Sequence, residues 1–103
     1  MIQRSESEIG IIAQFTAKEG KENELLEGIY YVMGQTLKEP GCKRFVFYQH
    51  VEDPKIVTAI EKFASQAAFD AHVAAPYTKN LLEVLLPELT SAQSITFHKE
   101  ILP

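Results

Sequence analysis

The pattern of apolar and polar positions predicts β-strands in four parts of the chain. Residues 9–17, IGIIAQFTA, place an apolar side chain at every second position. Residues 42–51 and 56–63 are rich in β-branched and aromatic residues, and the turn signal Glu-Asp-Pro at 52–54 separates them. These two strands are therefore expected to form a hairpin. Residues 93–101 alternate again and predict a fourth strand.

A helical period replaces the alternation between the first two strands. From Leu25 to Leu37, apolar side chains recur every three or four positions, and charged residues lie largely off that stripe. Pro40 and Gly41 follow and are expected to end the helix and turn the chain.

A second helical region follows the third strand. Ser65 is a suitable N-cap for a helix over 66–74. Pro76 interrupts this helix and suits the first turn of a second piece over 77–86, which Pro87 is expected to end.

The predicted order of elements, β-α-β-β-α-β, is the α+β, ferredoxin-like plan, with an antiparallel sheet covered by helices on one face. Apolar residues also fall on the other face, at Ile12 and in one of the two rows of the second strand, Val46/Tyr48 or Phe45/Phe47. A lone chain of 103 residues would leave that face in water. We therefore expect a symmetric homodimer built through it.

Length and composition fit one globular domain over residues 1–103, with its core in residues 9–101. Hydrophobic residues make up 46% of the chain and charged residues 23%, which are values of ordered domains. The net charge of −4, with Lys43–Arg44 as the only adjacent basic pair, argues against nucleic acid as a partner. The single cysteine, Cys42, excludes an intrachain disulfide, and no stretch approaches the roughly 20 apolar residues of a membrane span. We expect a cytoplasmic protein that does not associate with membranes.

Several short motifs are similar, in order and spacing, to those of a known family. They are a glycine after the first strand (Gly20), "EPGC" (39–42), an acid and an aromatic two apart (Glu61, Phe63), "A-x-x-x-H" (Ala68 to His72) and a small residue before proline (75–76). Over roughly residues 9–97 the chain thus resembles the antibiotic biosynthesis monooxygenase (ABM) family of dimeric α+β barrels. Two positions differ from the family's frequent pattern, since Phe63 stands for a Trp and Phe45 for a Tyr.

Glu61 and His72 are the candidate catalytic residues. Glu61 shares a strand face with apolar neighbours, where it could orient a histidine, cap the next helix or bind a lysine. His72 shares the inward helix face of Ala68 and Phe69. It is either a general base or a core histidine bonded to Glu61 or to a backbone carbonyl, and the two readings are compatible.

The predicted substrate pocket lies between helices and sheet, with His72 on its wall. Its aromatic lining is expected from Phe63, Phe69, Phe15, Phe45, Tyr48 and Tyr77. The spacing of His50, His72 and His98 does not support a metal site, so no metal is expected. No glycine-rich phosphate loop follows the first strand, so no nucleotide or flavin cofactor is expected either.

The resemblance implies cofactor-independent oxygenation of a small electron-rich aromatic or quinol-like compound. Two alternatives stay open: isomerisation of an enolisable small metabolite, and a non-catalytic dimeric module that binds a small molecule. A related branch of the family degrades haem, but Ala13 and Phe63 occupy the positions of its Asn and Trp, so the sequence does not favour that activity.

Overall fold

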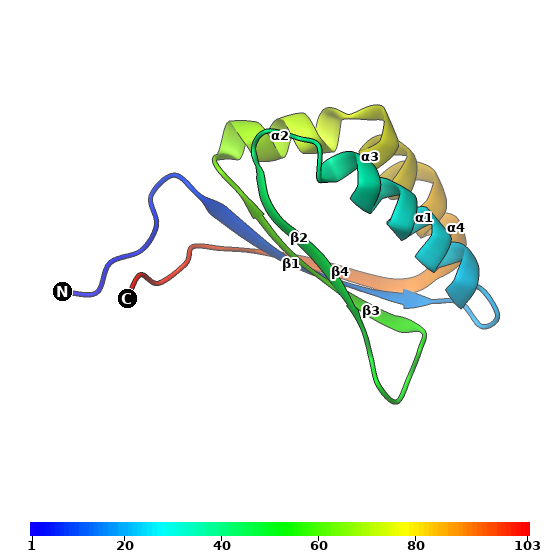
Figure 1. Ribbon diagram of the computed structural model, residues 1–103. Coiled ribbons are helices and arrows are strands. Elements are labelled where there is room, and N and C mark those ends of the chain that lie inside the picture. Colours follow the sequence, from blue (N-terminus) through cyan, green and yellow to red (C-terminus); the bar gives the residue numbers. More distant parts are fainter.

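Four antiparallel strands form one sheet in the order β2-β3-β1-β4, and the helices cover one of its faces (Figure 1). The structure is a computed structural model that describes residues 1–103. Its elements are β1 (Ile9–Ala17), α1 (Glu22–Thr36), β2 (Cys42–Gln49), β3 (Ile56–Phe63), α2 (Gln66–Ala74), α3 (Pro76–Asn80), the π-helical turn η1 (Leu81–Leu85), α4 (Leu86–Leu89) and β4 (Thr90–His98). The predicted α+β, ferredoxin-like order is confirmed.

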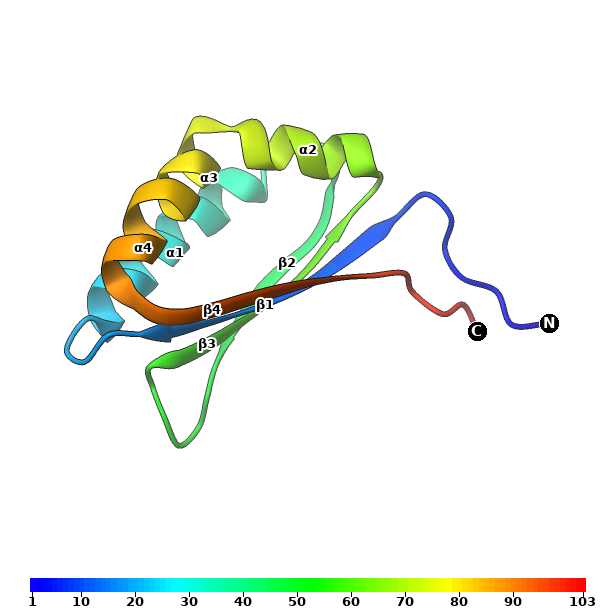
Figure 2. The same cartoon turned by 180° about the vertical axis from the view of Figure 1, so that it is seen from behind.

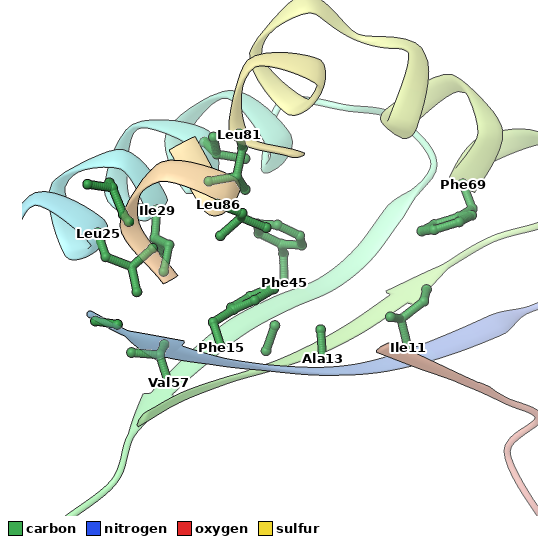
Figure 3. Close-up of a cluster of buried hydrophobic side chains, with 14 of the residues drawn as sticks. Ile11, Ala13, Phe15, Leu25, Ile29, Phe45, Val57, Phe69, Leu81 and Leu86 are labelled. Atoms are coloured by element: carbon green, nitrogen blue, oxygen red, sulfur yellow. The ribbon is translucent and has the colours of Figure 1, made fainter. Parts of the chain in front are cut away.

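The core lies between the sheet and the helices. Alternate residues of the central strand β1 point toward the helices, so Ile11, Ala13 and Phe15 are buried (Figure 3). They meet the apolar stripe of α1, where Leu25 and Ile29 are buried. The amphipathic period of α1 therefore points toward the same core as the alternation of β1.

The start of α2 agrees with the sequence. The helix spans Gln66–Ala74, and the Ser65 hydroxyl accepts a hydrogen bond of 3.1 Å from the backbone N–H of Ala68. This confirms Ser65 as the N-cap. None of the helices is long and apolar enough to cross a bilayer.

The predicted end of the helical region at Pro87 is wrong. Pro87 lies within α4, and the preceding residue, Leu86, donates its N–H to the carbonyl of Leu81, five residues back. Proline has no N–H, so in a regular α-helix Pro87 would leave the carbonyl four residues earlier without a donor. The wider π turn replaces the regular hydrogen-bond pattern at this point. The helix can then continue to Leu89.

The fourth strand is also displaced from its predicted position. β4 begins at Thr90 and ends at His98, whereas the alternation predicts 93–101. Ile101 instead forms an isolated antiparallel bridge with Arg4. The two terminal segments thus run beside each other away from the helical layer (Figure 2).

The sheet face away from the helices is partly apolar. Phe45 and Phe47 are opposite Glu61 and Ala59, on the helix side, so the Val46/Tyr48 row lies on the far face. Ile12 on that face is 42% exposed. This arrangement settles which row of β2 faces the helices, and the homodimer through the far face stays a prediction.

Candidate functional site

A cavity of about 170 Å³ lies between the helices and the sheet. Most of its wall is apolar, from Ala13, Phe15, Phe45, Phe47, Phe69, Val73, Leu81, Leu82 and Ile95. Five polar residues complete the wall: Glu61, His72, Thr78, Gln93 and Ser94. A mostly apolar pocket with a few polar groups is the usual form of a small-molecule site.

The imidazole of His72 is held inside the aromatic part of the core. His72 is 4% exposed, and the centroid of its ring lies 4.8 Å from that of Phe63 and 5.4 Å from that of Phe45. Nδ1 lies 2.9 Å from Oε2 of Glu39, in the loop between α1 and β2. The observed partner is therefore neither of the two predicted ones, Glu61 or a backbone carbonyl. The sequence does not place Glu39, 33 positions earlier, beside this histidine.

Glu39 also accepts a hydrogen bond from the hydroxyl of Tyr77, on the same oxygen. The break between α2 and α3 positions this donor, because Ala75 is extended (φ −65°, ψ 141°) and Pro76 begins the next helix. The same turn places the hydroxyl of Thr78 3.5 Å from Nδ1 of His72.

This network assigns the proton of the neutral imidazole. An ionised carboxylate only accepts hydrogen bonds, so Nδ1 of His72 must donate to Glu39. Nε2 then carries the lone pair. It has no hydrogen-bond partner in the protein, yet it is not among the fully buried unpaired atoms. Nε2 is therefore the ring nitrogen that is open to a bound molecule.

Glu61 lies on the same cavity wall in a different environment. It makes no hydrogen bond or ion pair, and it is opposite Ile11 on β1 and Phe45 on β2. Burial, and then the negative charge of Glu39, raise the pKa of Glu61 to about 7. At neutral pH this carboxyl is therefore divided between its acid and its carboxylate.

Two further groups near Glu39 keep their protons at neutral pH. Burial and the hydrogen bond to Glu39 raise the pKa of Tyr77 to about 12. Burial and the charge of Glu39 also raise the pKa of the Cys42 thiol. A neutral thiol is a poor nucleophile, so Cys42 is not a candidate nucleophile.

The structure brings most of the predicted site residues together. Glu61, His72, Phe15, Phe45 and Phe69 all line the cavity. Their roles in binding or catalysis remain predictions.

Three predicted lining residues do not reach the cavity wall. Phe63 is fully buried behind it, against His72 and Phe69. Tyr77 contacts Glu39 and is not part of the wall. The prediction that Tyr48 lines the pocket is wrong, because it is opposite Thr58 on the far face of the sheet and is 56% exposed. Alternation along β2 puts Phe47 on the wall in its place.

Glu39, Thr78 and Gln93 are absent from the predicted set. For Glu39 the available signal is its place in the "EPGC" motif. Thr78 and Gln93 carry no such signal, because only the helix break and the sheet register bring them to the cavity. The structure brings no three His, Cys, Asp or Glu side chains together at metal-binding distances.

Comparison with models of known protein families identifies the family of this chain. The family model described as antibiotic biosynthesis monooxygenase matches residues 8–84. The chain belongs to the antibiotic biosynthesis monooxygenase family. Its Glu39, Glu61 and His72 all lie within the matched residues. No curated protein matches the sequence.

Solved structures of similar proteins agree with the ABM fold. Protein SO0527 from Shewanella oneidensis is 27% identical, with 100% of both chains covered and a TM-score of 0.95. A conserved protein from Methanosarcina mazei Go1 is 27% identical, covering 89% of this chain and 91% of that chain, with a TM-score of 0.82. A structure described as an antibiotic biosynthesis monooxygenase is 22% identical over 92% of this chain and 99% of that chain, with a TM-score of 0.83. At that identity, the likeness concerns the fold alone.

Proposed function

We propose that this ABM protein is a cofactor-independent monooxygenase of a small electron-rich aromatic or quinol-like compound. One observation carries the proposal: Nδ1 of His72 is held by Glu39, which leaves Nε2 without a proton, and His72 is on the wall of an apolar cavity. An imidazole whose Nε2 carries no proton can act as a general base toward a bound hydroxyl group. Substrate and oxygen would meet where most of the wall is hydrocarbon and water is largely excluded.

The substrate supplies all the electrons in this reaction. A hydroquinone loses its hydroxyl proton to Nε2 of His72, and the electron-rich anion passes one electron to oxygen. The two radicals then combine into a ring-bound peroxide, which loses water. In sum, one hydroquinone and one O₂ give one hydroxyquinone and one water, so atoms and electrons balance without an external reductant.

The volume of the cavity limits the substrate. A cavity of about 150 Å³ holds a benzene-sized ring, and this one measures about 170 Å³. A single substituted ring therefore suits it better than a three-ring anthrone. Phe15, Phe45 and Phe69 would contact the ring through their apolar surfaces.

Glu61 would assist rather than initiate the reaction. With a pKa of about 7, it is partly protonated at neutral pH and can donate a hydrogen bond to a substrate or peroxide oxygen. The same pair of groups would serve an isomerase, since His72 could remove an acidic C–H proton and Glu61 could return a proton elsewhere. A binding module would use the cavity without either transfer.

Oxygen uptake by the purified protein tests the proposal. A panel of one-ring hydroquinones, three-ring anthrones and enolisable sugars would be offered with no flavin, nicotinamide or metal added. The proposal predicts uptake with a one-ring hydroquinone in equal molar amount to the product formed. Proton exchange or isomerisation of a sugar without oxygen uptake would favour the isomerase. Saturable binding without turnover would favour the binding module.

The homodimer belongs to the same proposal. Ile12, Val46 and Ile60 form an apolar strip across the far face of three neighbouring strands. A second copy would cover this strip without touching the helix side. A cytoplasmic location likewise stays a prediction.

A further inference from the structure

Glu39 accepts two hydrogen bonds on one oxygen, from the imidazole of His72 and the hydroxyl of Tyr77. It lies in the loop before β2, whereas both donors come from the α2–α3 region. No hydrogen bond joins Glu39 to Glu61. We propose that Glu39 is the positioning residue of the site: it fixes the tautomer of His72 and adds its negative charge to the surroundings of Glu61. This inference rests on the proposed function and adds a residue that acts through the two groups on the wall.

The first effect follows from geometry. The ring of His72 is confined between Phe45 and Phe63, so it cannot turn freely to offer either nitrogen. With the Glu39 carboxylate at Nδ1, the proton stays on Nδ1 and Nε2 keeps its lone pair, on a residue of the cavity wall. A carboxylate in this place also stabilises the imidazolium that forms when Nε2 takes a proton. Tyr77, held by Glu39 through its hydroxyl, keeps the carboxylate oriented.

The second effect is electrostatic. The titratable groups that interact with Glu61 or share its cavity wall are Glu39 in the loop, Cys42 on β2 and His72 on α2. Asp70 of α2 is exposed and accepts a hydrogen bond from Gln66. Arg44 and Lys62 belong to the other strand face, where they are paired in register, and Lys62 binds Glu8 and Glu100. The charge of Glu39 therefore acts on Glu61 without a nearby compensating cation. Burial raises the pKa of Glu61 most, and the charge of Glu39 raises it further.

Two variants of Glu39 separate these effects. Glu39→Gln keeps the shape of the side chain and removes its charge, whereas Glu39→Asp keeps the charge and shortens the side chain by one methylene group. The control is Glu27→Gln, which removes one negative charge from an exposed position of α1. The readouts are ¹⁵N NMR of the His72 ring for its tautomer and ¹³C NMR titration of the Glu61 carboxyl. Both use the full chain without substrate.

We expect wild type and Glu27→Gln to show the Nδ1–H tautomer, with the same Glu61 titration. In Glu39→Gln, the Nε2–H form gains population and Glu61 titrates at lower pH. In Glu39→Asp, the tautomer preference weakens and the high titration of Glu61 persists. Where a substrate is known, Glu39→Gln should lower kcat with little change in KM, by up to about 10⁴-fold, the loss that follows when the orienting acid of a catalytic triad becomes an amide.

The inference is overturned if both Glu39 variants, folded, keep the wild-type tautomer and the wild-type Glu61 titration. The NMR results do not depend on turnover. If they agree with expectation but wild type oxidises nothing, the proposed function fails and the role of Glu39 stands. If wild type oxidises a substrate but the Glu39 variants show the wild-type NMR results, the role of Glu39 fails and the proposed function stands.

Discussion

At the scale of single residues, two glutamates near one histidine have opposite surroundings. Glu39 accepts hydrogen bonds from His72 and Tyr77, whereas Glu61 has no partner and lies on an apolar wall. The negative charge of the first adds to the effect of burial on the second. A partly protonated carboxyl and an imidazole held at Nδ1 therefore share one cavity wall at neutral pH.

Replacement of His72 tests its role as the base. His72→Ala should lower turnover by about 10²–10⁴-fold, the usual loss when a general base is removed. Glu61→Gln should cost less, because the amide can still donate a hydrogen bond. The control is His98→Ala, since His98 is exposed on β4 and bonds only to Thr96. A folded His72→Ala protein with a near wild-type rate would leave His72 a packing residue.

The raised pKa of Glu61 predicts a pH-dependent cost to stability. In the unfolded chain this carboxyl ionises near its usual value of 4.5, but in the folded protein it does so only near 7. Between these values the folded state binds more protons, so stability falls as pH rises from about 4.5 to 7 and is constant above that range. At about 1.4 kcal/mol per pKa unit, the loss is roughly 3 kcal/mol at most, because solvent at the cavity mouth screens part of it.

Glu61→Gln removes this cost, since glutamine does not ionise. Urea unfolding at pH 8 should show the variant more stable than wild type by up to about 3 kcal/mol. At pH 4.5 the difference should shrink toward zero. Equal stability of the two proteins at both pH values would mean that Glu61 is well solvated in the folded state.

At the scale of elements, two local contacts hold the site together. The Ala75–Pro76 break directs Tyr77 and Thr78 toward Glu39 and His72. In addition, Gly41 packs so closely on α2 that a Cβ added to it would lie 2.5 Å from the Cβ of Ala68. The loop that carries Glu39 is thereby seated against the helix that carries His72.

Gly41→Ala should therefore push the loop away from α2. We expect a loss of about 1–3 kcal/mol in the free energy of unfolding, the usual cost of overpacking. Ala68→Gly removes the opposing methyl group, so the double variant should be more stable than Gly41→Ala alone. A double-mutant cycle by urea unfolding measures this coupling, and strictly additive effects would show that the contact is not tight.

The sequence predicts elements well where the period and the caps agree. The alternation of 9–17 and 56–63 and the N-cap Ser65 give β1, β3 and the start of α2 at their observed positions. Pro87 misleads, because the π turn before it depends on hydrogen bonds that no period reveals. The same is true of the site residues. Alternation along β3 predicts the side of the sheet on which Glu61 lies, but no sequence pattern predicts that the loop brings Glu39 to His72.

At the scale of the whole molecule, the two faces of the sheet are used differently. The helix side encloses the core and the cavity, whereas Ile12, Val46 and Ile60 leave an apolar strip on the far side. A homodimer through this strip should be visible by sedimentation at micromolar concentration, with a melting temperature that rises with protein concentration.

Ile12→Lys should shift that equilibrium to the monomer, because it places a charge in the centre of the strip. The control is Val51→Lys, since Val51 lies in the β2–β3 turn and is exposed. A wild-type protein that sediments as a monomer would contradict the dimer, as would an Ile12→Lys protein that associates like wild type.

The proposed reaction transfers one atom of molecular oxygen to the substrate with no cofactor. Mass spectrometry of the product formed from a one-ring hydroquinone under ¹⁸O₂ tests this claim most directly, with apo protein in chelator-treated buffer. We expect one ¹⁸O atom in each hydroxyquinone and one in the water released, at a rate that falls sharply in His72→Ala. Product that carries no ¹⁸O, or incorporation that is equal in wild type and His72→Ala, would contradict it.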